Sequence, residues 1–92
     1  MNETKTVFSA EDRKRMYWHS RRGMLELDLL LVPFAEERLA QLGDAELQLY
    51  SDLLREEDQD LFMWLTRRAA APSPRLQQMV DLVLAANSQE RG

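Results

Sequence analysis

The sequence predicts an all-α fold, a compact single-domain bundle of about five short helices, on three observations. Apolar residues recur every three or four positions, as they do along one face of a helix. No segment alternates polar and apolar residues with the period of two that is typical of strands. Only three glycines occur in 92 residues, and turn signals divide the chain at short intervals. A chain of this length forms one core but not two.

The first helix is predicted over residues 10–19. Ser9, followed three residues later by Asp12, matches a capping box in which aspartate replaces the usual glutamate or glutamine. This helix is expected to present Met16 and Tyr17 to the core.

A second helix is predicted from Met24 to about residue 42. Its apolar stripe consists of Leu27, Leu31, Phe34, Ala35 and Leu42. Gly43 occupies the position of a helix C-cap. Pro33 lies inside the helix, where it cannot donate a hydrogen bond to Leu29, and it is expected to bend the axis at a cost of about 3 kcal/mol.

Three further helices begin at residues that favour helix N-termini. Asp44 and Asp58 can each cap a helix, and Ser73 followed by Pro74 opens the last one, since proline suits the first helical position. The residues expected to face the core in the third helix are Leu47, Tyr50, Leu53 and Leu54. In the fourth they are Leu61, Phe62 and Leu65, with Trp64 beside them, and in the fifth they are Leu76, Met79, Val80 and Val83.

The expected helical core spans about residues 9–87 of a single domain that covers residues 1–92. An N-terminal arm (1–8) and a C-terminal tail (88–92) are expected to be flexible. The longest strongly apolar stretch has nine residues, 27–35, whereas a transmembrane helix needs about 20. The first residues are charged and lack an apolar signal core. We therefore expect a soluble, cytoplasmic protein with no membrane insertion.

The charge distribution favours a protein partner over a nucleic acid. Residues 1–22 carry a balance of +3, residues 23–66 a balance of −9 and residues 67–92 a balance of +2, in a chain of net charge −4. A nucleic-acid-binding protein normally has a broad basic face. Here a short basic arm lies beside an acidic body, so a helix-turn-helix DNA-binding function is not expected.

The chain shows no residue pattern typical of an enzyme or of a metal site. It has no cysteine and a single histidine, His19, which leaves no set of thiolate and imidazole metal ligands. The acidic run at 56–60 lacks the glycine and the alternating ligands of an EF-hand. Phosphate-binding glycine loops and nucleophile motifs are not found in the sequence. We therefore expect no catalytic residue, no metal site and no cofactor bound stably by the protein itself.

The stretch RRGMLELD, residues 21–28, is the strongest candidate for a functional site. Its two arginines lie near the end of one predicted helix, and Glu26 and Asp28 lie in the first turns of the next. Each placement is favourable to a helix dipole by about 0.3–1 kcal/mol. These residues therefore fit an ordinary helix junction in which Gly23 supplies the turn. They equally fit an exposed corner that one partner engages.

At this stretch the sequence resembles the succinate dehydrogenase assembly factor family, SdhE, formerly YgfY. The resemblance extends from about residue 13 to residue 87. It rests on three segments in order, RMYWHSRRGMLELDLLL (15–31), PF (33–34) and DLFMWL (60–65). One departure is that Asp58-Gln59-Asp60 replaces the family's common Asp-Pro-Asp, which reduces rigidity where the fourth helix begins.

The resemblance implies five helices and a specific function. Members of that family bind the flavoprotein subunit of succinate dehydrogenase, and in bacteria that of fumarate reductase. They promote covalent attachment of FAD to a histidine of that subunit. The chain would act on FAD of the partner and would not itself be an enzyme. Because that histidine belongs to the partner, His19 is not the attachment site. The alternative is an antitoxin-like regulatory protein-binding module.

The resemblance also assigns partner-binding residues. The family's Arg-Gly-x-x-Glu motif is matched by Arg22, Gly23 and Glu26. Arg15 and Asp28 match positions near the same surface.

Overall fold

The computed structural model describes residues 8–91, with side chains described up to residue 87. These residues form an all-α fold, as predicted, with no strand in the described range. The helices are α1 (Ala10–His19), α2 (Leu25–Arg38), a short 3-10 helix η1 (Leu39–Gln41), α3 (Asp44–Leu54), α4 (Asp58–Leu65) and α5 (Pro74–Arg91). The last helix continues past residue 87, the expected end of the helical core. The predicted flexibility of residues 1–7 and 92 concerns parts outside the described residues.

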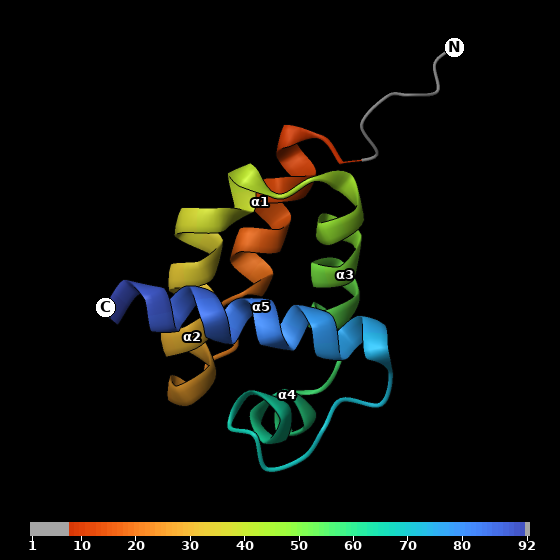
Figure 1. The fold of residues 1–92 in the computed structure, drawn as a ribbon. Coiled ribbons are helices and arrows are strands. Elements are labelled where there is room, and N and C mark those ends of the chain that lie inside the picture. Colours follow the sequence, from red (N-terminus) through yellow and green to blue (C-terminus); the bar gives the residue numbers. More distant parts are fainter. Residues whose placement is uncertain (1–7, 92) are drawn as a thin grey trace.

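Helix α5 crosses the other helices and joins them into one core (Figure 1). Helices α1, α2 and α3 lie side by side, α5 runs across them, and α4 lies below α5. Helix α5 packs against α2, α3 and α4, while α1 packs against α2 and α3. The α1–α2 connection and the start of α4 therefore lie at the same end of the molecule, where Arg22 and Asp58 meet.

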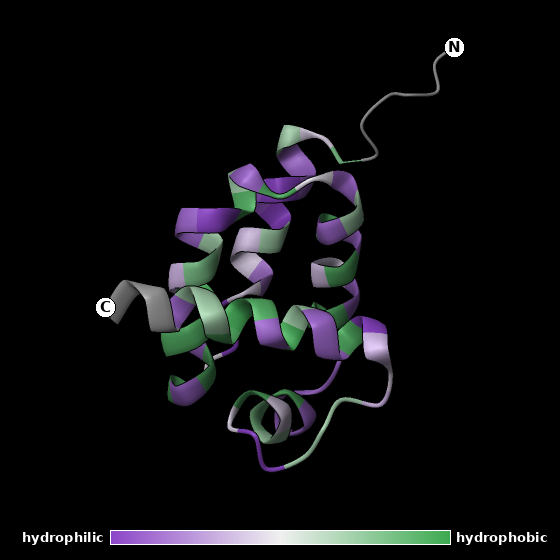
Figure 2. Cartoon of the chain, viewed as in Figure 1, coloured by the Kyte–Doolittle hydropathy of each residue, from purple (hydrophilic) through white to green (hydrophobic). Residues whose placement is uncertain are grey.

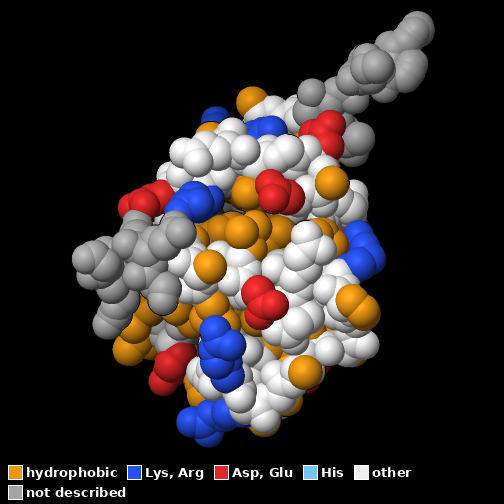
Figure 3. All heavy atoms as spheres, viewed as in Figure 1, with side chains coloured by type: hydrophobic (Ala, Val, Ile, Leu, Met, Phe, Trp, Pro, Cys, Tyr) orange, Lys and Arg blue, Asp and Glu red, His pale blue; other side chains and the backbone are white. Residues whose placement is uncertain are grey.

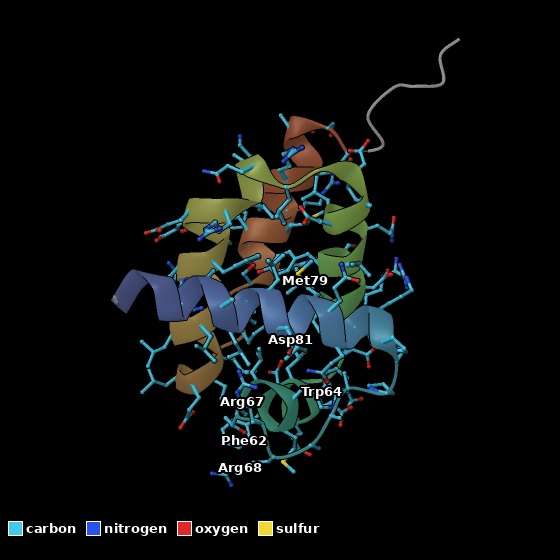
Figure 4. The ribbon with its side chains drawn as sticks, in the orientation of Figure 1. Phe62, Trp64, Arg67, Arg68, Met79 and Asp81 are labelled. Carbon is cyan, nitrogen blue, oxygen red and sulfur yellow. The ribbon has the colours of Figure 1, made fainter. Side chains whose placement is uncertain are left out.

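The predicted apolar stripes form the core, except that in α4 Trp64 is buried in place of Phe62. The largest fully buried apolar side chains are Tyr50, Phe34, Leu27, Leu31, Leu47, Leu53, Leu61, Met79, Val80 and Val83. Phe62 was expected inside, but it is half-buried, whereas Trp64 is buried. Burying the larger indole removes more apolar area from water. The Arg68 guanidinium lies 5.4 Å from the centroid of the Phe62 ring, and Figure 4 shows the two residues at the outer end of α4.

Each helix carries both polar and apolar residues, as the hydropathy colours in Figure 2 show. On the face shown in Figure 3, basic and acidic side chains are interspersed, with apolar side chains visible between them. No helix within residues 8–91 is long and apolar enough to cross a membrane.

The predicted helix starts agree with the structure to within one residue. The capping box of α1 is present: Ser9 Oγ accepts from the Asp12 N–H at 3.1 Å, and Asp12 Oδ2 accepts from the Ser9 N–H at 2.9 Å. This backbone N–H is the main cause that lowers the pKa of the Asp12 carboxyl. Ser73 Oγ accepts from the Leu76 N–H at 3.2 Å, with Pro74 as the first residue of α5.

Two N-cap predictions were wrong by one position. Asp44 and Asp58 are the first residues of α3 and α4, and the caps are Gly43 and Glu57. Both aspartates still place their charge in a first turn, where the helix dipole favours it.

The end of the second helix differs from the sequence prediction. Helix α2 ends at Arg38, and Gly43 is the N-cap of α3, with a φ of −77° instead of the positive φ of a C-cap glycine. Helix α2 continues through Pro33. The side-chain amide of Asn87 donates to the Leu30 carbonyl at 3.2 Å and so supports the backbone close to the proline.

Candidate partner-binding site

The candidate site is the corner that connects α1 to α2, residues 20–28. Its turn depends on Gly23, which has a φ of +88°. Nothing in the described structure lies within 4 Å of the position that a Cβ would take at Gly23. The glycine is therefore needed for its backbone conformation, since L-residues with a side chain rarely adopt this φ, and not to avoid an internal clash.

The inner side of the corner is built around Arg22, whose side chain is only 14% exposed. Its Nε donates to Asp58 Oδ1 at 2.9 Å. The remaining contacts of the guanidinium are with backbone carbonyls: Nη1 donates to His19 at 3.0 Å and Leu54 at 2.9 Å, and Nη2 donates to Glu56 at 2.9 Å. Carbonyls at the C-termini of helices lack intrahelical partners and favour a cation. Arg22 thus ties together the ends of α1 and α3 and the start of α4.

Two further polar contacts fix this inner side. Asp28 Oδ1 accepts from the backbone N–H groups of Arg22 at 2.7 Å and of Gly23 at 3.4 Å. Ser20 and Tyr50 are fully buried, and their hydroxyls are hydrogen-bonded to each other. Because Ser20 Oγ also donates to the Met16 carbonyl at 2.9 Å, Tyr50 is the donor to Ser20. Burial is the main cause that raises the pKa of Tyr50 to about 12.

The outer side of the corner faces solvent. Glu26 is exposed, and its carboxylate makes no hydrogen bond or ion pair with any described residue. Large apolar side chains near the ends of the two connected helices are also exposed, Trp18 on α1 to 62% and Leu25 on α2 to 67%. Leu29, one turn further along α2, is 62% exposed. Exposed aromatic and aliphatic side chains of this kind are typical of surfaces that bind other proteins.

The structure brings four of the five predicted site residues together. Arg22, Gly23 and Asp28 are joined by hydrogen bonds, and Glu26 lies on the same corner. An exposed corner describes Glu26 and Gly23, whereas Arg22 fits the helix-junction interpretation, because its guanidinium binds three carbonyls and one carboxylate. Arg15 lies apart on α1, exposed and paired with Asp12 at 3.2 Å.

Sequence reasoning missed the structural partner of the motif, Asp58. It was expected only to cap α4, because a contact across 36 positions has no signal in one sequence. Trp18 and Leu25 were likewise not singled out. Their unusual exposure could be anticipated only from helical phase, which places them away from the buried residues Met16 and Leu27.

A groove of about 610 Å³ lies beside the corner, between α1 and α3. Its lining residues are Phe8, Asp12, Arg15, Met16, His19, Arg22, Ser51, Leu54 and Arg55. The groove therefore joins Arg15 to the corner through His19 and Arg22. No group of three possible metal ligands occurs among the described residues.

Comparison with known proteins identifies the family. Residues 14–87 match the family model described as "Flavinator of succinate dehydrogenase". The chain is similar to proteins named FAD assembly factor SdhE. That of Pseudomonas savastanoi pv. phaseolicola is 54% identical over 70 residues, covering 76% of this chain and 83% of the relative. That of Mannheimia succiniciproducens is 45% identical over 73 residues, covering 79% and 85%.

A more distant relative extends the match over more of the chain. The FAD assembly factor SdhE of Photobacterium profundum is 40% identical over 82 residues, covering 89% of this chain and 93% of the relative. The family match includes the whole corner and the residues of α3 and α4 that hold it. The chain therefore belongs to the SdhE family of succinate dehydrogenase flavinators.

Proposed function

We propose that this protein is a cytoplasmic assembly factor that binds the flavoprotein subunit of succinate dehydrogenase and promotes covalent attachment of FAD to it. The observation that carries the proposal is the family match over residues 14–87, together with relatives named FAD assembly factor. The flavoprotein subunit of fumarate reductase is a second proposed partner.

The proposed mechanism needs binding and no catalytic group on this chain. The flavin and the partner's own residues supply the covalent chemistry. A helper that binds one conformation of the flavoprotein more tightly than others raises the population of that conformation. The protein then accelerates flavinylation without being an enzyme and without retaining FAD.

The corner suggests a division of roles within the motif. Glu26 is exposed and has unused acceptor capacity, so we assign it to direct contact with the partner. Gly23 lets the partner's backbone approach closely. Arg22 is a positioning residue, because its guanidinium is occupied by Asp58 and by helix-end carbonyls. Asp28 holds the same turn from the other side.

The test is a bacterial strain that lacks its own assembly factor, complemented with this protein. Covalent flavin in the flavoprotein subunit is measured by in-gel fluorescence after denaturation, and the tagged protein is purified to identify what it binds. The expected result is restored fluorescence and co-purification of the flavoprotein subunit. Stable expression without either would contradict the proposal, and recovery of a small membrane protein instead would favour the antitoxin-like alternative.

A second measurement addresses the cofactor. The purified protein is expected to be colourless after desalting, because no covalent flavin site is proposed on this chain. Yellow colour that survives denaturation and desalting would contradict this part of the proposal.

A further inference from the structure

We propose that the groove between α1 and α3 binds an acidic segment of the flavoprotein subunit, with Arg55 as an anchor on its α3 side. The inference rests on the proposed function and adds a second contact region to it. It assigns a role to residues outside the Arg-Gly-x-x-Glu motif.

Each wall of the groove carries an arginine, and the one on the α3 wall is unpaired among the described residues. Arg15 lies on the α1 wall and Arg55 on the α3 wall, and both are exposed. The Arg55 guanidinium makes no hydrogen bond or ion pair with the described residues. Among the described lining residues, Asp12 is the acidic one, and it already accepts from Ser9 and Arg15. An unpaired guanidinium facing a groove recognises carboxylates.

The positive charge of Arg55 is unusual for its region of the chain. Residues 23–66 have a balance of −9, yet Arg55 is one of only two basic residues among them. It is the C-cap of α3 and lines the groove, whereas none of the acidic residues at 56–60 is among the described lining residues. The local field in the groove therefore favours an anionic partner even though the whole protein repels anions.

The apolar lining favours a protein segment over a free anion. Met16, Leu54 and the half-buried Phe8 provide apolar surface between the two arginines. The groove volume of about 610 Å³ falls within the range of about 300–1,000 Å³ typical of binding pockets. A segment that places an apolar side chain on this surface and carboxylates on the arginines satisfies both features.

Continuity with the corner selects the flavoprotein subunit as the occupant. Arg22 lines the groove and also forms the inner side of the corner, with Glu26 four residues away in sequence. Because the groove adjoins the corner at His19 and Arg22, a single partner large enough to cover the corner can also reach the groove. One partner then contacts both surfaces, and its affinity rises through the linked contacts.

The test compares Arg55→Glu with the matched variant Arg68→Glu. Both replace an exposed arginine with glutamate and change the net charge equally, but Arg68 does not line the groove and lies over the Phe62 ring instead. Binding of the purified flavoprotein subunit is measured at low and at high salt. Arg55→Glu is expected to weaken binding about tenfold at low salt and to reduce its salt dependence. Arg68→Glu is expected to bind like the unmodified protein.

The absence of cysteine permits a second, independent readout. Ser51→Cys in the groove and Gln78→Cys on the exposed surface of α5 each provide one site for a thiol-linked photo-crosslinker. The expected crosslink from position 51 is to a flavoprotein segment that contains Asp or Glu, with much weaker crosslinking from position 78. A crosslink from position 51 to a second copy of this chain, to its own residues 1–7 or to a segment without acidic residues would overturn the proposal.

Different results would contradict the proposed function and the proposed groove contact. If the unmodified protein does not bind the flavoprotein subunit, the proposed function is wrong. If it binds, and Glu26→Gln weakens binding while Arg55→Glu does not, the groove assignment alone is wrong. Melting temperatures of all variants are compared with that of the unmodified protein, so that unfolding is not mistaken for lost binding.

Discussion

The inner and outer sides of the α1–α2 corner use the same short motif for different purposes. On the inner side, Arg22 is largely buried and binds one carboxylate and three carbonyls. On the outer side, Glu26 is exposed and unpaired among the described residues. A motif shared across a family can thus contain residues required for stability next to residues available for a partner. Measurements of stability and flavinylation on the same variants separate the two.

The largest effect is expected for Arg22→Ala. The change removes the ion pair with Asp58 and leaves the carbonyls of Leu54, Glu56 and His19 without this donor. The free energy of unfolding should fall by about 2–4 kcal/mol. Chemical denaturation followed by circular dichroism measures this change. Flavinylation should decline as well, because the corner loses its support.

Arg22→Lys is the informative control. A lysine keeps the charge but cannot reproduce the planar fork that bonds Asp58 and several carbonyls at once. We expect it to recover less than half of the lost stability. Full stability in Arg22→Ala would show that the inner network is dispensable and would contradict the division between the two sides.

The next effect on stability is expected from the ionisation of Tyr50, which lies behind the corner. Its folded-state pKa is raised to about 12, whereas an unfolded tyrosine has a pKa near 10. Below pH 10 both states are protonated and the stabilisation is complete. Between pH 10 and 12 only the unfolded state loses its proton, so stability should fall by about 2–3 kcal/mol.

Tyr50→Phe isolates that contribution. The variant lacks the ionisable hydroxyl, so its stability should decline less between pH 10 and 12 than that of the unmodified protein. Near pH 7 it should lose about 1 kcal/mol from the missing hydrogen bond to Ser20. Identical pH profiles for the two proteins would show that Tyr50 does not titrate as described.

The third prediction concerns Gly23 on the outer side. Gly23→Ala and Gly23→Arg should each lower the free energy of unfolding by about 1–2 kcal/mol, because both place a side chain at positive φ. A Cβ at Gly23 would meet no described atom within 4 Å, so the loss caused by the positive φ should be similar in the two variants. Flavinylation should separate the variants, since only the long arginine blocks a partner's close approach. Equal flavinylation by the two would argue against close contact at Gly23.

A second residue with positive φ lies away from the corner, and this residue carries a side chain, unlike Gly23. Arg67, just after α4, has a φ of +63°, and the following N–H groups of Arg68 and Ala69 donate to the Met63 carbonyl. Figure 4 shows Arg67 near the outer end of α4. Arg67→Gly should therefore raise the free energy of unfolding by about 0.5–1 kcal/mol, because it relieves the strain of the side chain. Thermal unfolding measures the gain, and a loss would mean that the Arg67 side chain makes a compensating contribution.

These two turns show what one sequence can and cannot reveal. Gly23 could be identified as a turn because glycine tolerates positive φ, whereas an arginine at such a position gives no signal. Helical periodicity identified all five helices and most of their buried faces. Gly43 was misassigned because a glycine between two helices is compatible with ending one or starting the next.

The candidate site was only partly predictable for a related reason. The motif residues are adjacent in sequence, so their common corner followed from local rules. Whether Arg22 points inward depends on Leu54, Glu56 and Asp58, which are more than 30 positions away. The groove likewise requires α1 and α3 to be neighbours, and a single sequence does not specify that contact.

The smallest effect on stability, and the sharpest test of the comparison, is expected for Glu26→Gln. Glutamine has nearly the same shape as glutamate and lacks the charge, and Glu26 has no partner among the described residues. Its charge in the first turn of α2 favours the helix dipole only slightly, so the free energy of unfolding should change by about 0.5 kcal/mol or less. A partner donor that meets the carboxylate would lose a charge-assisted hydrogen bond, which is roughly twice as strong as a neutral one. Flavinylation of the partner subunit should therefore fall strongly while the melting temperature stays within a few degrees.

The matched control is Glu57→Gln, an exposed glutamate that caps α4 and should leave both quantities nearly unchanged. If Glu26→Gln supports full flavinylation, the outer side of the corner does not make the proposed contact, and only the inner side would account for the motif.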